Sequence, residues 1–295
     1  MGTGYVLYNP IAGNGNGRED AKILDMILAQ PLQFYDMTHI TNYAAFLSSM
    51  EAEDYLVIAG GDGTLNRFIN DTAGIYIGQE ILYFPVGTGN DFARELHKEP
   101  LDEPFAITKY LKNLPTVQVK GKTYRFLNGV GFGIDGYCCE VGDRLRAKPK
   151  QKVNYTAIAI KGLLFHFNAR NAKVTVDGVT YEYEKVWIAP TMHGKFYGGG
   201  MIPAPAQNRL SPEGTLSLML IHGAGRLKTL CVFPGIFKGE HVKHTDMVAV
   251  HTGHEITVEF DRPTPLQIDG ETILNVTGYT ARSAAYASQK VKSAV

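Results

Sequence analysis

The sequence lacks the features that mark membrane-spanning, disulfide-stabilised and nucleic-acid-binding proteins. It has no uninterrupted apolar run of about 18 residues, the length needed to cross a bilayer. Its three cysteines include an adjacent pair and have no zinc-type spacing, so we expect neither a disulfide framework nor a cysteine metal site. Lysine plus arginine and aspartate plus glutamate number 29 each, so no overall positive charge favours nucleic acid as a partner. The start of the chain also lacks a signal-peptide pattern, and we expect a cytoplasmic protein.

Two glycine-rich turns are the most informative segments that are present. GGDGTLN (Gly60–Asn66) follows the apolar run Tyr55–Ala59, and GTGND (Gly87–Asp91) follows the apolar run Ile81–Val86. Each turn precedes a segment with helical spacing of apolar residues. Glycine lets a backbone approach a phosphate closely, and the amides at a helix start attract anions. The pattern predicts a nucleotide at the carboxyl ends of neighbouring parallel strands.

The alternation of strand and helix patterns predicts the fold class. It continues from Tyr5 to about residue 112 and indicates an α/β domain with a doubly wound parallel sheet. From Val117 onward, short alternating segments separated by turn residues predict an antiparallel β-rich domain, with helices at Val153–Phe167 and Leu227–Phe237. We expect domains at 1–115 and 116–276. The remaining segment, 277–295, either returns to the first domain or frays.

Asp62 and Asp91 give the two turns their chemistry. A carboxylate beside phosphates is repulsive unless a cation lies between them, so Asp62 favours Mg²⁺ bound together with a nucleotide. In the second turn Thr88 offers a hydroxyl to phosphate or ribose, and Asp91 is a candidate cap for the following helix. Gly-Asp-Gly is also ordinary turn chemistry. A third glycine-rich turn, Asn9–Gly13, makes nucleotide binding the favoured interpretation.

The order and approximate spacing of these segments resemble the diacylglycerol kinase catalytic-domain family. That family comprises bacterial diacylglycerol-kinase-like lipid kinases, with sphingosine kinases as relatives and NAD kinases as more distant ones. The resemblance rests on Asn9-Pro10 with Gly13, GGDGT with Asn66, GTGND with Phe92, FLNGVGFGIDG (Phe126–Gly136), GGGM followed by APA (198–206), and QIDGE (Gln267–Glu271). It implies a nucleotide-binding catalytic domain, a β-rich lipid-substrate domain and an active-site cleft between them.

The resemblance also implies which residues bind ATP. They come from the three turns and from Thr38, near the end of an expected strand. The candidates are Asn9, Pro10, Ile11, Ala12, Gly13, Thr38, Gly60, Gly61, Asp62, Gly63, Thr64, Leu65, Asn66, Gly87, Thr88, Gly89, Asn90 and Asp91. Two positions depart from the family pattern, with Ala12 in place of a frequent serine and Arg67 in place of a glutamate. For Arg67 a solvated helix charge is the favoured interpretation.

The QIDGE segment is the candidate catalytic turn. Asp269-Gly270 predicts a tight hairpin turn, so Asp269 and Glu271 could face the same site. By similarity Glu271 is the proton acceptor, with Asp269 beside it and Asp62 organising metal-bound phosphates. Asp135 takes a supporting role. The alternative is a solvated hairpin turn.

The resemblance implies a second, structural metal site on the loop Arg209–Leu218. Its ligands would be the carbonyls of Leu210 and Thr215 and the carboxylate of Glu213. Relatives usually carry aspartate at the position of Glu213 and often an acid at the position of Ser217. Oxygen ligands remain, but the lost charge leaves cation binding at this loop an open question.

A basic stretch beside an apolar one suggests peripheral membrane contact. Arg144–Lys152 contains five basic residues and is followed by the apolar segment Tyr155–Phe167. Such a pair suits an anionic membrane surface. The alternative is a solvated loop followed by a core helix.

Together these features predict an ATP- and Mg²⁺-dependent lipid kinase, with diacylglycerol as the leading acceptor and phosphatidate as the product. Two alternatives remain open: a kinase of a water-soluble metabolite, as NAD kinases are, and a non-catalytic nucleotide-binding regulator. We expect a cytoplasmic, peripherally membrane-associated protein, and a homodimer is left open.

Overall fold

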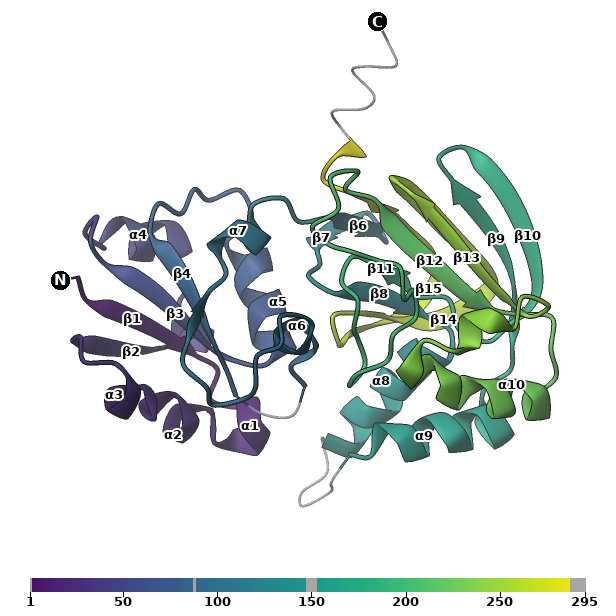
Figure 1. Ribbon diagram of the computed structural model, residues 1–295, viewed down its shortest axis with the longest axis horizontal. Coiled ribbons are helices and arrows are strands. Elements are labelled where there is room, and N and C mark those ends of the chain that lie inside the picture. The colour runs from purple at the N-terminus through teal and green to yellow at the C-terminus, as the bar shows by residue number, and fades with distance from the viewer. Residues whose placement is uncertain (1, 87–88, 147–152, 287–295) are drawn as a thin grey trace, which may run out of the picture. The chain divides into compact units, whose positions relative to one another are not determined.

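The chain divides into two compact units. The computed structural model describes residues 2–86, 89–146 and 153–286, and the units are Met1–Leu114 and Pro115–Val295 (Figure 1). Within the described residues, no helix combines the length and apolar character needed to cross a membrane.

The first unit contains a five-stranded sheet in the order β2-β1-β3-β4-β5. Its strands are β1 (Gly4–Tyr8), β2 (Leu32–Asp36), β3 (Tyr55–Gly60), β4 (Glu80–Pro85) and β5 (Phe105–Ala106). The first four are parallel, and only β5 runs antiparallel to its neighbour. In this register Tyr8 lies opposite both Asp36 and Ala59, so the carboxyl ends of the parallel strands share one edge.

Helices cover both faces of this sheet, as a doubly wound fold requires (Figure 1). Val57 and Phe84 pack with Leu24 on one face, while the Tyr83 ring contacts the Phe92 ring on the other. The helices are α1 (Ala12–Gly15), α2 (Gly17–Lys22), α3 (Leu24–Ile27), η1 (Met37–His39), α4 (Tyr43–Ser48), α5 (Asp62–Asp71), α6 (Asp91–Glu95) and α7 (Thr108–Leu111). The predicted α/β domain is confirmed.

The second unit is built on a ten-stranded sheet in which every described pairing is antiparallel. Its strands are β6 (Thr116–Val119), β7 (Lys122–Arg125), β8 (Gly129–Phe132), β9 (Arg170–Val176), β10 (Val179–Val186), β11 (Thr191–Met192), β12 (Leu216–Ile221), β13 (Val248–Gly253), β14 (Glu255–Ile268) and β15 (Glu271–Arg282). The predicted β-rich domain is therefore confirmed.

Strand β14 changes partners along its length. Its first half pairs with β9 and its last residues pair with β8, while β15 runs beside both halves. The register shifts between Glu259 and Thr264, and such a bulge bends a strand. The two halves enclose one apolar core, in which the rings of Phe132 and Phe260 stack at 4.1 Å.

The helices of the second unit form a separate apolar layer. They are α8 (Ile134–Arg146), α9 (Tyr155–Lys161), the π-helical turn η2 (Gly162–His166), α10 (Arg226–Val232), η3 (Phe233–Lys238) and η4 (His241–Lys243). These helices lie beside the sheet (Figure 1). Their apolar side chains pack with those of Trp187 and Met219. The two helices expected from the sequence are present, but the longest helix of this unit, α8, was not predicted.

Helix α8 is not predictable from the sequence pattern, because its first residues have the composition of a turn. GFGIDG contains three glycines, and glycine normally interrupts helices. A Cβ built on Gly136 would lie 1.9 Å from the carbonyl oxygen of Pro265 in β14. The glycine therefore permits close packing of helix on strand.

The end of β15 lies within the segment that the sequence analysis set apart as 277–295. Residues 277–282 continue β15; of these, 278–282 pair with β14, and 280–282 also pair with β6. Residues 287–295 lie outside the described residues.

Candidate active site

Most of the predicted nucleotide-binding residues gather at one edge of the first unit. Asn9 follows β1, Thr38 follows β2, Asp62 follows β3 and Gly89 follows β4. These strands are parallel and adjacent in the order β2-β1-β3-β4, so the four loops lie along the carboxyl edge of the sheet. Ligands of open α/β sheets bind at this edge. Gly87 and Thr88 fall outside the described residues.

The carboxylate of Asp62 joins two of these loops. Its Oδ2 accepts a hydrogen bond from the Asp91 N–H at 2.7 Å, and its Oδ1 accepts one from the Phe92 N–H at 3.1 Å. Its own N–H donates to the Gly89 carbonyl oxygen at 3.1 Å. Asp62 therefore supplies negative charge to the start of α6, where it is stabilising. Asp91 is not the cap expected from the sequence, because α6 begins at Asp91 and the capping carboxylate comes from the other loop.

A glycine allows the two loops to meet. A Cβ built on Gly61 would lie 3.1 Å from the carbonyl oxygen of Gly89, closer than side chains normally approach. The glycine-rich character of the loops thus has an internal cause in addition to any ligand. Helix α5 then begins at Asp62, with Gly61 rather than a side chain at its cap position.

The loop after β1 is a side-chain-stabilised turn. Asn9 Oδ1 accepts a hydrogen bond from the Ile11 N–H at 3.2 Å, and the Asn9 carbonyl accepts one from the Ala12 N–H at 3.0 Å. The short helix α1 starts at Ala12, and the Ile11 side chain is exposed. Pro10 lies between Asn9 and Ile11 in this turn.

Asp36 holds Thr38 at the end of β2. Its Oδ1 accepts hydrogen bonds from the Thr38 hydroxyl at 2.6 Å and the Thr38 N–H at 2.8 Å. Partial burial acts to raise the pKa of Asp36, but these hydrogen bonds outweigh it and lower that pKa below its usual value. Thr38 therefore lies at the same edge as the other loops, with a fixed hydroxyl.

Several of the remaining candidates are buried rather than presented to a ligand. The side chains of Thr64, Leu65 and Asn66 on α5 are buried. Asn90 Oδ1 accepts a hydrogen bond from the Tyr83 hydroxyl at 3.2 Å. These positions offer a ligand mainly their backbone. Arg67 pairs with Asp71 at 3.2 Å along the exposed side of α5, as expected for a solvated helix charge.

In the second unit, Asp269 and Gly270 form the tight turn between β14 and β15. Both have positive φ, 47° and 94°, and Ile268 pairs with Glu271 across the turn. This is the geometry of a type I′ hairpin, which favours Asp-Gly. The predicted turn is confirmed. Glu271 is exposed, and no described residue hydrogen-bonds or ion-pairs with its carboxylate.

The carboxylate of Asp269 fastens this turn to a distant segment. It accepts hydrogen bonds from the N–H groups of Leu127 at 2.5 Å, Asn128 at 2.8 Å and Gly129 at 2.9 Å. The Asp269 N–H donates in turn to the Gly129 carbonyl oxygen at 3.0 Å. A carboxylate with these partners is suited to holding the turn. Glu271, the next residue but one, is the acid with room to accept a proton.

Further residues hold the segment that binds Asp269. Arg209 donates to the Asn128 side-chain oxygen at 3.0 Å and to the Leu127 carbonyl at 3.2 Å. The His193 N–H donates to the Asn128 carbonyl at 2.9 Å. Burial, followed by the nearby Arg209 charge, lowers the pKa of His193 to about 3, so its ring is neutral at physiological pH. The sequence analysis did not identify Asn128 or Arg209, because contacts across about 80 residues leave no local pattern.

A buried polar pair lies behind the turn. Gln267 Nε2 donates to Asp135 Oδ2 at 2.9 Å, and both side chains are almost fully buried. Burial raises the pKa of Asp135 to about 6, although Gln267 and the nearby Tyr197 hydroxyl act in the opposite direction. Asp135 was expected to support the site. Gln267 begins the QIDGE segment but received no role of its own, because nothing in the sequence shows that its side chain meets Asp135.

Two of the three groups predicted as metal ligands accept hydrogen bonds within the protein. Leu210 is exposed, the carboxylate of Glu213 accepts the Ser211 hydroxyl, and the Thr215 carbonyl accepts Gln207 Nε2 at 3.1 Å. Across the described ranges, no group of three or more histidine, cysteine, aspartate or glutamate side chains is placed to hold a metal. Cation binding at this loop, through one carboxylate and two carbonyl groups, therefore stays a prediction.

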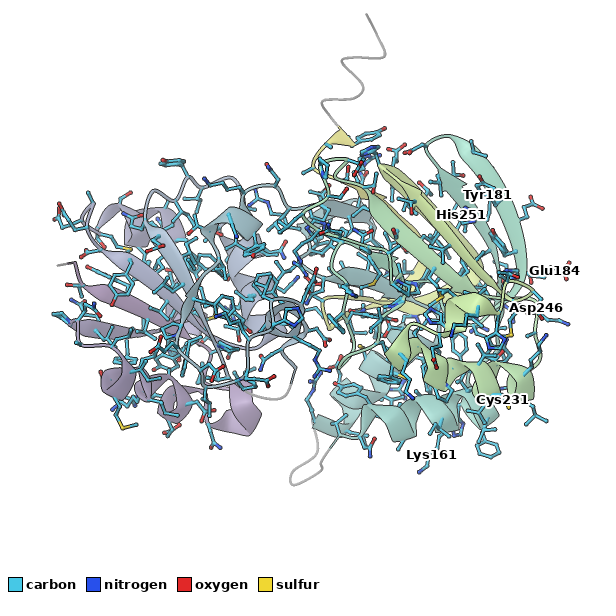
Figure 2. The ribbon with its side chains drawn as sticks, in the orientation of Figure 1. Lys161, Tyr181, Glu184, Cys231, Asp246 and His251 are labelled. Atoms are coloured by element: carbon cyan, nitrogen blue, oxygen red, sulfur yellow. The ribbon has the colours of Figure 1, made fainter. Side chains whose placement is uncertain are left out.

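The predicted membrane element is partly core and partly surface. Ile158 and Leu163 are buried against the sheet, whereas Ile160 and Phe165 are exposed, Phe165 by 71%. Figure 2 shows Lys161 on the outer side of α9. Of the basic stretch, Arg144 and Arg146 pair with Glu140 and Asp143 on α8, and 147–152 lie outside the described residues.

Comparisons with known proteins agree with this architecture. The model of the diacylglycerol kinase catalytic domain matches residues 3–119. The model of the YegS C-terminal NAD kinase beta sandwich-like domain matches residues 128–283, more than half of the chain.

Whole-length relatives carry kinase names. The diacylglycerol kinase of Bacillus subtilis (strain 168) is 26% identical over 285 residues, which cover 90% of this chain and 88% of that protein. The diacylglycerol kinase of Staphylococcus carnosus (strain TM300) is 27% identical over 277 residues, which cover 90% and 87%.

A crystal structure of a diacylglycerol kinase from Bacillus anthracis str. Sterne shares the fold. Its TM-score is 0.58 at 18% identity, with 96% of this chain and 93% of that chain covered. Because the two domain models match in succession over the two structural units, the chain belongs to the diacylglycerol kinase catalytic-domain family and is a phosphotransferase of the lipid-kinase type.

Proposed function

We propose that the protein transfers the γ-phosphate of ATP to the hydroxyl of a lipid, with diacylglycerol as the leading acceptor and phosphatidate as the product. The observation that carries the nucleotide part is the loop edge of the first unit. There, Asp62 ties the loops after β3 and β4 into one structure at the carboxyl ends of parallel strands. The names of the relatives support the acceptor.

In this proposal the loop edge binds the triphosphate through its backbone. Helix α5 spans ten residues from Asp62 and points its N-terminal end at this edge, so its dipole and first N–H groups favour an anion. Mg²⁺ enters as part of the substrate Mg·ATP. It neutralises phosphate charge and needs few protein ligands, which suits a chain without a described carboxylate cluster.

Glu271 is the proposed proton acceptor. As the lipid oxygen attacks the γ-phosphorus, the bond to the ADP oxygen breaks and the hydroxyl proton passes to the Glu271 carboxylate. Asp269 fixes the turn that presents Glu271, through its three backbone hydrogen bonds. We therefore assign Asp269 and Asp62 to positioning, and Glu271 to chemistry.

We also propose peripheral contact with anionic membranes. Exposed apolar side chains lie on adjoining helices, namely Ile160 on α9, Phe165 on η2 and Leu227 on α10. Ile160 and Phe165 also follow the basic stretch 144–152 closely in sequence. Each basic residue near an anionic surface contributes about 1 kcal/mol to binding.

Liposome pelleting tests the membrane part. Neutralising the five basic residues of 144–152 should reduce pelleting with phosphatidylserine vesicles. Neutralising Lys120, Lys122 and Arg125 on the β6–β7 hairpin should leave it unchanged. Equal pelleting of the first variant and wild type would remove the membrane proposal.

Transfer from labelled ATP tests the chemistry. The acceptors are diacylglycerol, a sphingoid base and an isoprenoid alcohol in vesicles, together with water-soluble metabolites, including NAD, without vesicles. We expect label on diacylglycerol, lost in Glu271→Gln while ATP binding persists. Label on a metabolite alone would show a soluble-substrate kinase, and ATP binding without transfer to any acceptor would show a regulator.

A further inference from the structure

A single buried glutamine connects the catalytic turn to Asp135. Gln267 Nε2 donates to Asp135 Oδ2 at 2.9 Å, and Gln267 Oε1 accepts a hydrogen bond from the Gly270 N–H at 2.6 Å. A carboxylate can only accept and a backbone N–H can only donate, so just one orientation of the amide satisfies both partners. The side chain is therefore fixed at both ends.

The neighbouring strand is shaped to accommodate this link. Gly131 in β8 lies opposite Gln267 in β14. A Cβ built on Gly131 would lie 1.4 Å from Asp135 Oδ2 and 2.6 Å from Gln267 Nε2. Any side chain at residue 131 would displace the pair, so the space that holds it depends on this glycine.

Burying the Gln267–Asp135 pair has a cost in folding free energy. Asp135 is buried, and burial of a carboxyl group disfavours its charged form. An apolar pair of similar size would pack in the same interior without that cost. The position of the link is informative, because Gly270 directly precedes Glu271.

We propose that Gln267 is a positioning residue that holds the Asp269–Glu271 turn against Asp135 and so fixes the backbone from which the Glu271 side chain extends. The inference rests on the proposed function, in which Glu271 accepts the lipid proton. The turn is held from two sides, by Asp269 on the segment Leu127–Gly129 and by Gln267 on Asp135. Loss of either set of hydrogen bonds allows the turn to move. Misplacement of a reacting group by about 1 Å can lower the catalytic rate about 100-fold.

Two substitutions at residue 267 test this role. Gln267→Met keeps the size and removes both hydrogen bonds, so kcat for diacylglycerol in anionic vesicles should fall about 10- to 100-fold. The KM for ATP should stay within about twofold, because the ATP loops belong to the other unit. Thr264→Val is the matched control: Thr264 is a buried polar residue of the same strand, away from the turn, and its loss should leave kcat unchanged.

Gln267→Glu gives a response that a merely structural role would not produce. Its carboxyl group faces Asp135, so the pair needs a shared proton before residue 267 can donate again. Activity relative to wild type should therefore recover as the pH falls from about 8 to about 6. The other groups around Asp135 are Tyr197, Tyr279, Cys138 and Cys139, and burial raises the pKa of each, so they stay neutral in this range.

Hydrogen exchange at Gly270 separates this inference from the proposed function. Exchange in peptides covering 266–273 should be faster in Gln267→Met than in Thr264→Val, whether or not any lipid is phosphorylated. If wild type labels no lipid, the proposed function fails, and exchange still decides the role of Gln267. A kcat and an exchange rate in Gln267→Met that match those of Thr264→Val would overturn the inference. If Gln267→Met does not fold, a Gln267→Glu pH profile identical to wild type would do the same.

Discussion

Each unit contains a motif aspartate whose carboxylate binds backbone N–H groups of another segment, but the two segments differ in sequence distance. Asp62 binds the start of α6, about 30 residues away, whereas Asp269 binds Leu127–Gly129, about 140 residues away. The first contact joins consecutive units of one sheet. The second joins opposite ends of the β-rich unit. The same interaction, a carboxylate that accepts backbone N–H hydrogen bonds, therefore joins segments close in sequence in the first unit and distant in sequence in the second.

An acid in a motif turn can therefore serve to bind the backbone of another segment. From the sequence, Asp62, Asp269 and Glu271 are all catalytic candidates. In the structure only Glu271 has a carboxylate exposed and without a described partner. Five experiments test this comparison between the two backbone-binding aspartates and Glu271, the proposed proton acceptor.

The largest expected effect is on turnover at the second-unit turn. Glu271→Gln should lower kcat about 1,000-fold, because the amide cannot accept the lipid proton. The midpoint of urea unfolding should not change, because the side chain is exposed. A variant that loses ATP binding instead would show that Glu271 is not the proton acceptor.

The next largest effect is on stability, and it compares Asp269 with Asp62. Asp269→Ala leaves three backbone N–H groups without their acceptor and should cost about 3 kcal/mol in the free energy of unfolding. Asp62→Ala leaves two and should cost about 2 kcal/mol. Urea unfolding measures both.

Nucleotide binding distinguishes the same two variants. Asp62→Ala should weaken ATP binding measured by calorimetry, and Asp269→Ala should leave it near the wild-type value while turnover falls. Equal losses of ATP binding in the two variants would contradict the division of roles between the units.

A smaller effect concerns the buried carboxyl behind the turn. Burial raises the pKa of Asp135 from 3.8 to about 6, so the stability that comes from its protonated form is complete below pH 3.8 and is lost as the pH rises through 6. Between pH 5 and pH 8, wild type should lose about 1 kcal/mol of unfolding free energy relative to Asp135→Asn. Urea unfolding at the two pH values measures this, and parallel pH profiles would show that Asp135 titrates normally.

The smallest effect belongs to the predicted metal loop. Among the described residues, the side-chain partner of Glu213 is the Ser211 hydroxyl, and no group of three metal-ligating side chains includes it, so millimolar Mg²⁺ or Ca²⁺ should shift the melting temperature of wild type and Glu213→Ala equally. A cation-dependent rise in wild type alone would show that the loop binds metal after all. Differential scanning fluorimetry is sufficient for this comparison.

The sequence predicts what is local in this molecule. The alternation of patterns up to residue 112 gives the parallel strands, and Asp269-Gly270 gives the hairpin, because both signals lie within a few residues. Helix α8 and the link through Gln267 were not predictable in this way. Gly131 and Gly136 look like turn residues, although they serve close packing against β14 and its side chains. The partners of Asp62 and Asp269 become visible only when separate strands are brought together.

The hydrogen bonds of Asp62 have a practical consequence for engineering nucleotide preference. Since that carboxylate spans the loops after β3 and β4, neither loop is an independent module. A chimera that imports GGDGTLN from a relative should import the matching GTGND and the first turn of α6 with it, and a library that randomises GGDGTLN alone should mostly recover functional sequences that keep Asp62.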